Sequence, residues 1–272
     1  MYKFALLHKM IHPAYNLFLA IYLAHLLTDF VFQTTRIVSN KYRGEWRGYL
    51  IHGLTHYVAV LAIVTIADPH RLPTLSFQLL AVSLSLVHLL IDWAKISLTK
   101  SHWIPDNALA FMLDQAVHLV TVIGAVFLLL HPSLQTFLFW LNRIRFLQES
   151  ILLVSVVYVL VIFGGGYFIR ALIGSLWKEE QGQSKKEHAE VINAGLYIGW
   201  LERFLVLTAL FLQSPATVGF ILAAKSIARY PELKSVRFAE YFLIGTLLSV
   251  AIAIAGAIIL LKALYGTVTL GK

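Results

Sequence analysis

The feature that most limits how this chain can fold is a series of apolar stretches, each long enough to cross the roughly 30 Å hydrocarbon core of a bilayer. Seven are present, at 15–35, 50–67, 75–98, 107–130, 150–172, 193–213 and 238–262. An eighth, 215–229, is too short to span and is expected to be re-entrant or interfacial. Only 13% of the residues are charged, against about 25% in a soluble domain. The sequence therefore predicts an all-α, polytopic helical membrane bundle with about seven transmembrane helices surrounded by the lipid bilayer.

The formal net charge of +8 arises largely from lysines and arginines in the connections between these stretches. Positive residues gather in the cytoplasmic loops of membrane proteins. The connections 36–49, 95–106 and 177–190 are therefore expected on the cytoplasmic side of the inner membrane, with the N-terminus outside. This rule accounts for the charge without nucleic acid, which is not expected as a partner. Because the chain has no cysteine, any metal must be held by nitrogen and oxygen atoms.

The histidines and aspartates inside the first four predicted spans fall into pairs four residues apart. Three of the five aspartates lie in spans, each four residues from a histidine, and a fourth span carries two histidines at the same spacing. The pairs are His25/Asp29, His52/His56, His88/Asp92 and Asp114/His118. Residues four apart share one helix face. Each pair lies near a predicted cytoplasmic connection, so the pairs are expected to converge in an antiparallel bundle.

The number and type of these side chains indicate a metal centre. Five histidines and three carboxylates exceed the four ligands of a structural zinc site and suit two divalent ions of zinc, manganese or iron. Residues 1–131 are predicted to form this four-helix core, and residues 132–272 the remaining helices. Two ions in one site activate a water and stabilise an in-line displacement, which favours phosphoester hydrolysis. Asp29, Asp92 and Lys95 are the candidate catalytic residues, with Lys95 also the main candidate to neutralise a buried carboxylate.

Four other polar residues are candidates for binding the substrate. Gln33 extends the face of the first pair by one turn, and Lys41 lies in the following connection, where it is placed to bind a phosphate headgroup. Arg203 lies within the sixth predicted span and Lys225 in the short segment after it. Charges at such depth either reach a substrate or form a structural ion pair, here with Glu202.

A family resemblance is carried by the segments AHLLTDFVFQT (24–34), HGLTH (52–56), VHLLIDWAK (87–95) and DQAVH (114–118). Together they resemble the DUF3307 family of bacterial and phage membrane proteins, and GLYIGWLERFLV (195–206) and GFILAAKSIARY (219–230) resemble its C-terminally extended members. The spacing of the pairs is more loosely similar to DUF457/YdjM-like membrane-bound metal-dependent hydrolases. That resemblance implies that the eight paired residues are metal ligands.

Three other functions compete with a hydrolase. A divalent-metal transporter would continue its polar residues to the other face, whereas the outer halves 57–66 and 119–130 are almost purely apolar. A di-iron lipid oxygenase usually needs HxxHH clusters, which the chain lacks. A non-catalytic scaffold would bury carboxylates at a cost. The expected function is a metal-dependent phosphohydrolase or phosphodiesterase acting at the cytoplasmic leaflet on a lipid or another membrane-associated substrate, with the metal, the substrate and the oligomeric state left open.

Overall fold

The computed structural model of the chain describes residues 2–131, 147–176 and 185–266, which are helical apart from short connections and contain no β-strand. Within these ranges, six stretches are long and apolar enough to cross a membrane: Ala14–Phe32, Trp46–Ala67, Leu75–Lys100, Ala108–Leu130, Ser150–Gly174 and Phe238–Tyr265. The protein is thus a multi-pass helical membrane protein, which confirms the predicted fold class. The predicted span 193–213 falls almost entirely in α9 (Lys185–Phe211). The side chains at the start of this helix are not described, so its crossing of the membrane stays a prediction.

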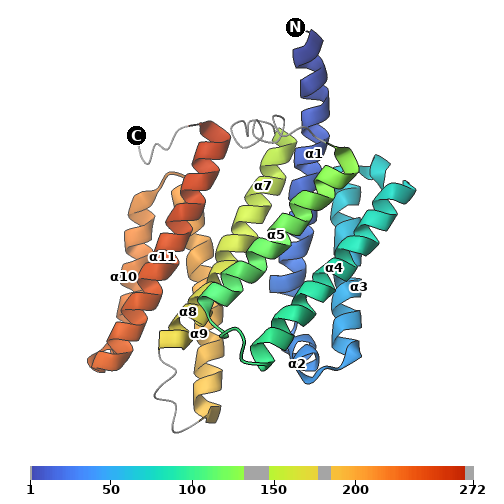
Figure 1. Cartoon of the computed structure of the whole chain (residues 1–272). Coiled ribbons are helices and arrows are strands. Elements are labelled where there is room, and N and C mark those ends of the chain that lie inside the picture. The colour runs from blue at the N-terminus through green and yellow to red at the C-terminus, as the bar shows by residue number, and fades with distance from the viewer. Residues whose placement is uncertain (1, 132–146, 177–184, 267–272) are drawn as a thin grey trace. The chain divides into compact units, whose positions relative to one another are not determined.

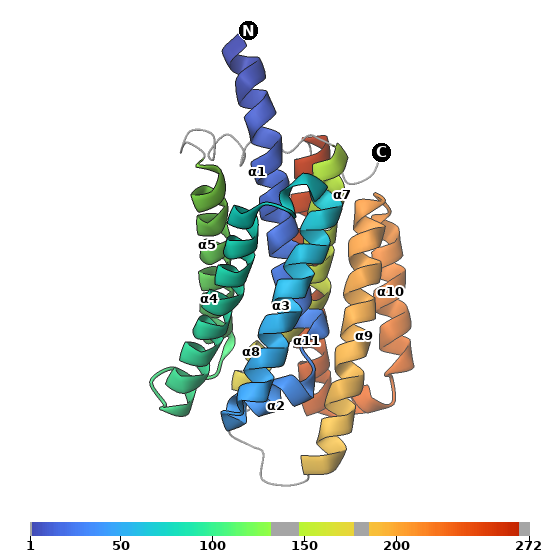
Figure 2. The same ribbon diagram turned by 90° about the vertical axis from the view of Figure 1, so that its right-hand side faces the viewer.

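Four long helices form a closed ring in the first of two compact units, Met1–Val156. They are α1 (Tyr2–Leu27), α3 (Trp46–Ala67), α4 (Leu75–Lys100) and α5 (Ala108–Leu130). Both α1 and α4 pack against α3 and α5. The short helix α2 (Thr35–Arg43) lies at the end of the ring where α4 and α5 are connected (Figures 1 and 2). The 3-10 turn η2 (Pro69–Arg71) connects α3 and α4 at the opposite end.

The interior of the ring is divided into an apolar half and a polar half. Away from α2 it is filled by apolar side chains that are almost fully buried, among them Ile21, Val60, Phe77 and Val122. Toward α2 the buried side chains are polar, and they include five histidines. The outer surface of the ring carries exposed leucines, valines and isoleucines, as expected where lipid replaces water. Only the polar half therefore offers groups for chemistry.

The last turn of the first helix is a π-helix, η1 (Thr28–Phe32), rather than a regular α-helical turn. The hydroxyl of Thr28 donates a hydrogen bond to the backbone carbonyl of Ala24 at 2.8 Å. This bond satisfies a carbonyl near the point where the α-helix changes into the π-helix. Single π turns inside α-helices occur often at functional sites. This one contains Asp29, the carboxylate that α1 directs into the polar half of the ring.

The short helix α2 is held close to α3 by a glycine. Its first turn is capped by Thr34, whose hydroxyl accepts from the backbone N–H of Ile37 at 3.4 Å, and it ends at Gly44 with φ +78°, a conformation that glycine adopts without strain. A Cβ on Gly48 of α3 would lie 2.9 Å from the backbone nitrogen of Lys41. Only glycine thus lets α2 approach α3 this closely, and the approach positions Lys41.

The second unit, Val157–Lys272, is built around α9 and α11 (Val236–Tyr265), which pack against each other. The span Ser150–Gly174 comprises most of α7 (Leu147–Val159), the π-helical η3 (Leu160–Gly164) and α8 (Gly165–Leu176). The apolar helix α10 (Pro215–Ala228) packs against α9 and has 14 residues, too few to span, as predicted; the 3-10 turn η5 (Glu232–Lys234) follows it. The predicted domain boundary after residue 131 borders 132–146, which lie outside the described residues.

Candidate metal centre

The eight paired residues all lie in the polar half of the ring formed by α1, α3, α4 and α5. The five histidine residues are each 3% exposed or less. The side chains of Asp29, Asp92 and Asp114 are 9%, 10% and 7% exposed. The structure thus brings together four pairs that local spacing could only assign to separate helices.

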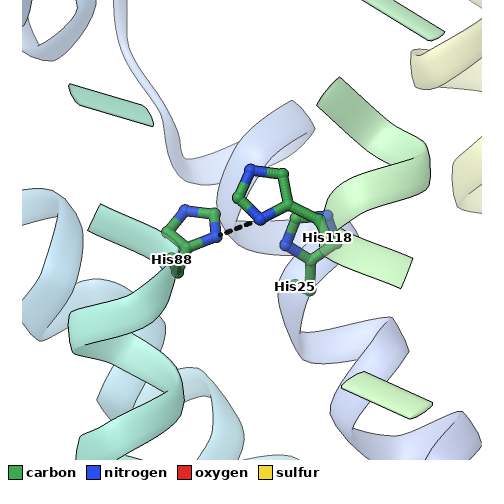
Figure 3. A group of neighbouring side chains, drawn as sticks. All are labelled: His25, His88 and His118. Atoms are coloured by element: carbon green, nitrogen blue, oxygen red, sulfur yellow. Dashed lines mark hydrogen bonds between the residues drawn. The ribbon is translucent and has the colours of Figure 1, made fainter. Parts of the chain in front are cut away.

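His88 of α4 lies at the middle of the five imidazole rings. Its ring centroid is 4.4 Å from that of His118, 4.5 Å from His56, 4.9 Å from His52 and 5.2 Å from His25. Figure 3 shows His88 beside His118 of α5 and His25 of α1. The Nδ1 atoms of His88 and His118 are 3.2 Å apart, and the Nε2 atoms of His88 and His52 are 2.8 Å apart. Nitrogen donors from all four helices therefore gather around one residue.

In the part of the chain that the structure describes, three groups of donor atoms are close enough to share a metal ion, the atoms of each group lying within 4.8 Å of one another. The groups are Asp29/His52/His88, Asp92/Asp114/His118 and His25/His88/His118. Two ligands bound tetrahedrally at zinc distances lie roughly 3.3 Å apart. The Nε2 atoms of His52 and His88 are 3.3 Å and 3.2 Å from Asp29 Oδ1, so two of the three distances in the first group already have that spacing, and the third, between the two Nε2 atoms, is shorter at 2.8 Å. Since His88 and His118 each belong to two groups, the groups overlap as those of a two-metal centre would.

Several atoms of this cluster are buried without a hydrogen-bond partner among the residues that the structure describes. They are Asp29 Oδ1, Asp114 Oδ1, His25 Nε2 and His118 Nε2. Buried polar atoms in proteins are nearly always satisfied, and leaving one unsatisfied costs about 1–3 kcal/mol. All four residues belong to the donor groups above. A bound cation would satisfy these atoms, and their carboxylate and imidazole chemistry fits zinc, manganese or iron.

Two lysines form ion pairs with the cluster. Lys41 of α2 donates to Asp92 Oδ2 at 2.6 Å, and Lys95 of α4 donates to Asp114 Oδ2 at 2.8 Å. The Lys41 side chain is 4% exposed and that of Lys95 29%. Lys41 was predicted to lie in a connection and face a headgroup, but the structure buries it because α2 folds back under the ring. Lys95 pairs with Asp114 across the interface between α4 and α5, and its predicted catalytic role stays a prediction.

Other polar side chains support the cluster from outside. Gln33, which the sequence predicted, places its Nε2 atom 3.2 Å from His52 Nε2. Ser85 was not predicted; its hydroxyl lies 3.0 Å from Nδ1 of His56. Its position three residues before His88, on the same helix face, is a signal that would have found it. His56 was predicted as a ligand and belongs to none of the three donor groups, so among the described contacts it packs on His88 and bonds Ser85.

Arg203 and Lys225, predicted to bind substrate, lie in the second unit and contact protein groups there. The Nε and Nη2 atoms of Arg203 donate to the carbonyl of Ile162 at 3.0 Å and 2.8 Å, a carbonyl within the π-helical η3. Lys225 pairs with Glu202 and donates to Thr246 Oγ1 at 2.9 Å. Of the two readings that the sequence left open, the ion pair with Glu202 is present in the structure, and substrate binding stays a prediction.

Comparison with known proteins gives one match. Residues 17–147 match a family described as "Protein of unknown function (DUF3307)", and this range contains all eight paired residues together with Gln33, Lys41 and Lys95. No curated protein and no solved structure matches the chain. The looser similarity to metal-dependent hydrolases of the DUF457/YdjM type stays a resemblance of residue spacing.

Proposed function

We propose that this chain, which belongs to the DUF3307 family through residues 17–147, is a membrane-embedded, metal-dependent hydrolase acting on a phosphorylated lipid or a similar membrane-associated phosphoester. One observation carries the proposal. Three overlapping donor groups from four helices lie in one buried layer, and several of their atoms have no hydrogen-bond partner among the described residues. A purely structural polar core would be expected to satisfy those atoms.

Two of the donor groups would each hold one divalent ion. Asp29 and His52 belong to one, Asp92 and Asp114 to the other, and His88 and His118 are shared with the third group. Ions bound there would polarise a phosphoester and lower the pKa of a bound water toward about 7. The protein's own contribution is to fix the carboxylates before substrate arrives.

The two lysines would have different roles in this reaction. Lys41, buried on Asp92, holds that carboxylate in place. Lys95 is 29% exposed, so its ammonium group can turn toward an anionic substrate at the edge of the cluster. With the five imidazoles neutral, as metal ligands must be, three carboxylates face these two ammonium groups, and one negative charge is unbalanced in the absence of metal. This excess favours cation binding in the layer.

The apolar half of the ring supports hydrolysis over metal transport. A transport path would carry polar groups through the bundle to the other face, whereas Ile21, Val60, Phe77 and Val122 are 3% exposed or less directly beyond the cluster. Substrate would therefore approach from the end that carries α2. We assign that end to the cytoplasmic side of the inner membrane because the basic connections 36–49 and 95–106 lie there.

The first test is the metal content of the detergent-purified protein, measured by inductively coupled plasma mass spectrometry. The variant Asp29→Asn/Asp92→Asn should lose most of the metal, since it removes one carboxylate from each of two donor groups. The matched control is Asp68→Asn/Asp106→Asn, which changes the two aspartates outside the predicted spans and should keep wild-type metal content. Two equivalents of metal in the wild type are expected.

The second test is hydrolysis of phosphorylated lipids in mixed micelles, followed by the release of phosphate or of the headgroup. Activity should disappear with a chelator, return with zinc, manganese or iron, and be absent from the Asp29→Asn/Asp92→Asn variant. A wild-type protein that binds no metal after reconstitution would refute the proposal. Metal retained by the double variant would show that the carboxylates are not ligands and would refute the assignment of the site.

A further inference from the structure

A cavity of about 360 Å³ opens beside α2, outside the metal cluster. Its polar lining consists of Thr34, Asn40, one glutamate and three arginines, namely Glu45, Arg36, Arg43 and Arg47. This volume lies at the lower end of the range for small-molecule pockets, which suits a lipid headgroup. The cavity is therefore a second site, distinct from the buried cluster, with strongly basic walls.

The arginines differ in how far they are already engaged. Arg43 is held by Glu45, with Nε and Oε1 2.8 Å apart, and by Asn40, with Nη2 and Oδ1 2.6 Å apart. Among the described residues, Arg36 and Arg47 have no carboxylate partner. Both are exposed, and guanidinium groups bind phosphate oxygens through paired hydrogen bonds. Two guanidinium groups are thus available for an anionic ligand.

The cavity also borders a lipid-facing surface. Ile51 belongs to its lining and is 48% exposed, and Leu54 and Val58, on the same face of α3, are 60% and 53% exposed. Trp46, at the start of α3, is 67% exposed, as is common at the membrane–water interface. An apolar stripe therefore leads from the basic cavity along α3 toward the membrane interior. A soluble phosphate compound would use the arginines and leave the stripe without a role.

We propose that this cavity binds the phosphate headgroup of an anionic membrane lipid through Arg36 and Arg47, with an acyl chain lying along Ile51, Leu54 and Val58. The cavity adjoins the metal cluster along the chain. Thr34 follows Gln33, whose amide contacts His52, and Ile51 directly precedes His52. Transfer of the bound lipid to the cluster is a further step that rests on the proposed hydrolase function, whereas the binding itself does not.

The test compares lipid binding by native mass spectrometry of the full-length protein in detergent. Dioleoyl phosphatidic acid is titrated against dioleoyl phosphatidylcholine, with glycerol 3-phosphate as the soluble probe. The variant Arg36→Gln/Arg47→Gln is compared with a control of equal charge, Arg71→Gln/Lys100→Gln, whose residues lie outside the cavity. Thermal unfolding, followed by tryptophan fluorescence, is measured for each variant as a check that the four-helix ring has folded, and metal content is measured separately.

The expected result is that wild type binds phosphatidic acid at least about tenfold more tightly than phosphatidylcholine. This preference should be lost in Arg36→Gln/Arg47→Gln and retained in the control, with metal content unchanged in both. Equal affinity of the wild type for the two lipids would overturn the proposal, and so would an equal loss in the control. Binding of glycerol 3-phosphate as tight as that of the lipid would also overturn it, by making the site one for a soluble phosphate.

The same experiment separates this site from the hydrolase activity. The variant Asp29→Asn, which leaves the buried pair between Lys41 of α2 and Asp92 intact, should keep the lipid preference while it loses metal and hydrolysis. Selective lipid binding in a wild-type protein without hydrolytic activity would support the cavity and count against the proposed reaction only. Loss of the lipid preference in the aspartate variant, with the ring still folded, would overturn the assignment of binding to the arginines.

Discussion

Replacing Asp92 by asparagine should both destabilise the metal-free protein and remove metal. Asp92 is 8% exposed, and its Oδ2 atom is 2.6 Å from the ammonium group of Lys41, which is 4% exposed. The amide of asparagine keeps the shape but leaves a buried ammonium group without its counter-charge. Breaking a buried ion pair in this way costs about 3–5 kcal/mol. For a unit of this size that corresponds to a decrease in Tm of roughly 6–20 °C.

The assay is thermal unfolding in detergent after chelation, followed by tryptophan fluorescence, together with metal analysis. Adding Lys41→Met to Asp92→Asn removes the unpaired charge, so it should restore at least half of the lost Tm without restoring metal. The control Asp68→Asn breaks a more exposed pair with Arg71 and should cost about 1 kcal/mol or less. A Tm for Asp92→Asn within about 2 °C of wild type, or full metal binding by the double variant, would refute the reasoning.

Because His88 belongs to two donor groups, His88→Ala should lose metal. His56 belongs to none of these groups, so His56→Ala should still bind metal, with affinity reduced by about 10–100-fold. Metal titration distinguishes the two variants. Gly48→Ala should push α2 away from α3 and destabilise the protein by about 1–3 kcal/mol, seen as a lower Tm, and an unchanged Tm would show that α2 adapts. In the second unit, Glu202→Gln removes the partner of Lys225 and should lower Tm while metal content stays at the wild-type level. Loss of metal in this variant would contradict the expectation that the Glu202–Lys225 ion pair and the metal cluster are independent of each other.

Much of the fold follows from local sequence. Six apolar spans and the short helix 215–229 are recognisable because a chain in lipid must form its backbone hydrogen bonds within each helix, so length and hydropathy suffice. The π turn at Asp29 did not follow, because a run such as TDFVF is compatible with a regular helix. The packing of α2 beneath the ring could not be predicted either, because the sequence of a nine-residue polar segment is equally compatible with a loop.

The candidate site was predictable in composition but not in its contacts. The i,i+4 spacing places His88 with Asp92 on one face of α4, and helix geometry alone ensures this. The spacing cannot show that His88 lies at the centre of the rings or that His56 lies at the edge. Those positions depend on the rotation and depth of each helix, which packing across the whole ring decides.

The sequence by itself determined that this is a helical membrane protein and that four of its helices each carry two ligand-type side chains, because hydropathy and helix periodicity act over a few turns. Only the tertiary structure decided that Lys41 pairs with Asp92, 51 residues away, and that His88 lies at the middle of the five imidazole rings. Side chains so distant along the chain become neighbours through the closure of a four-helix ring, and the order and rotation of its helices are properties of the packed bundle, not of any one segment.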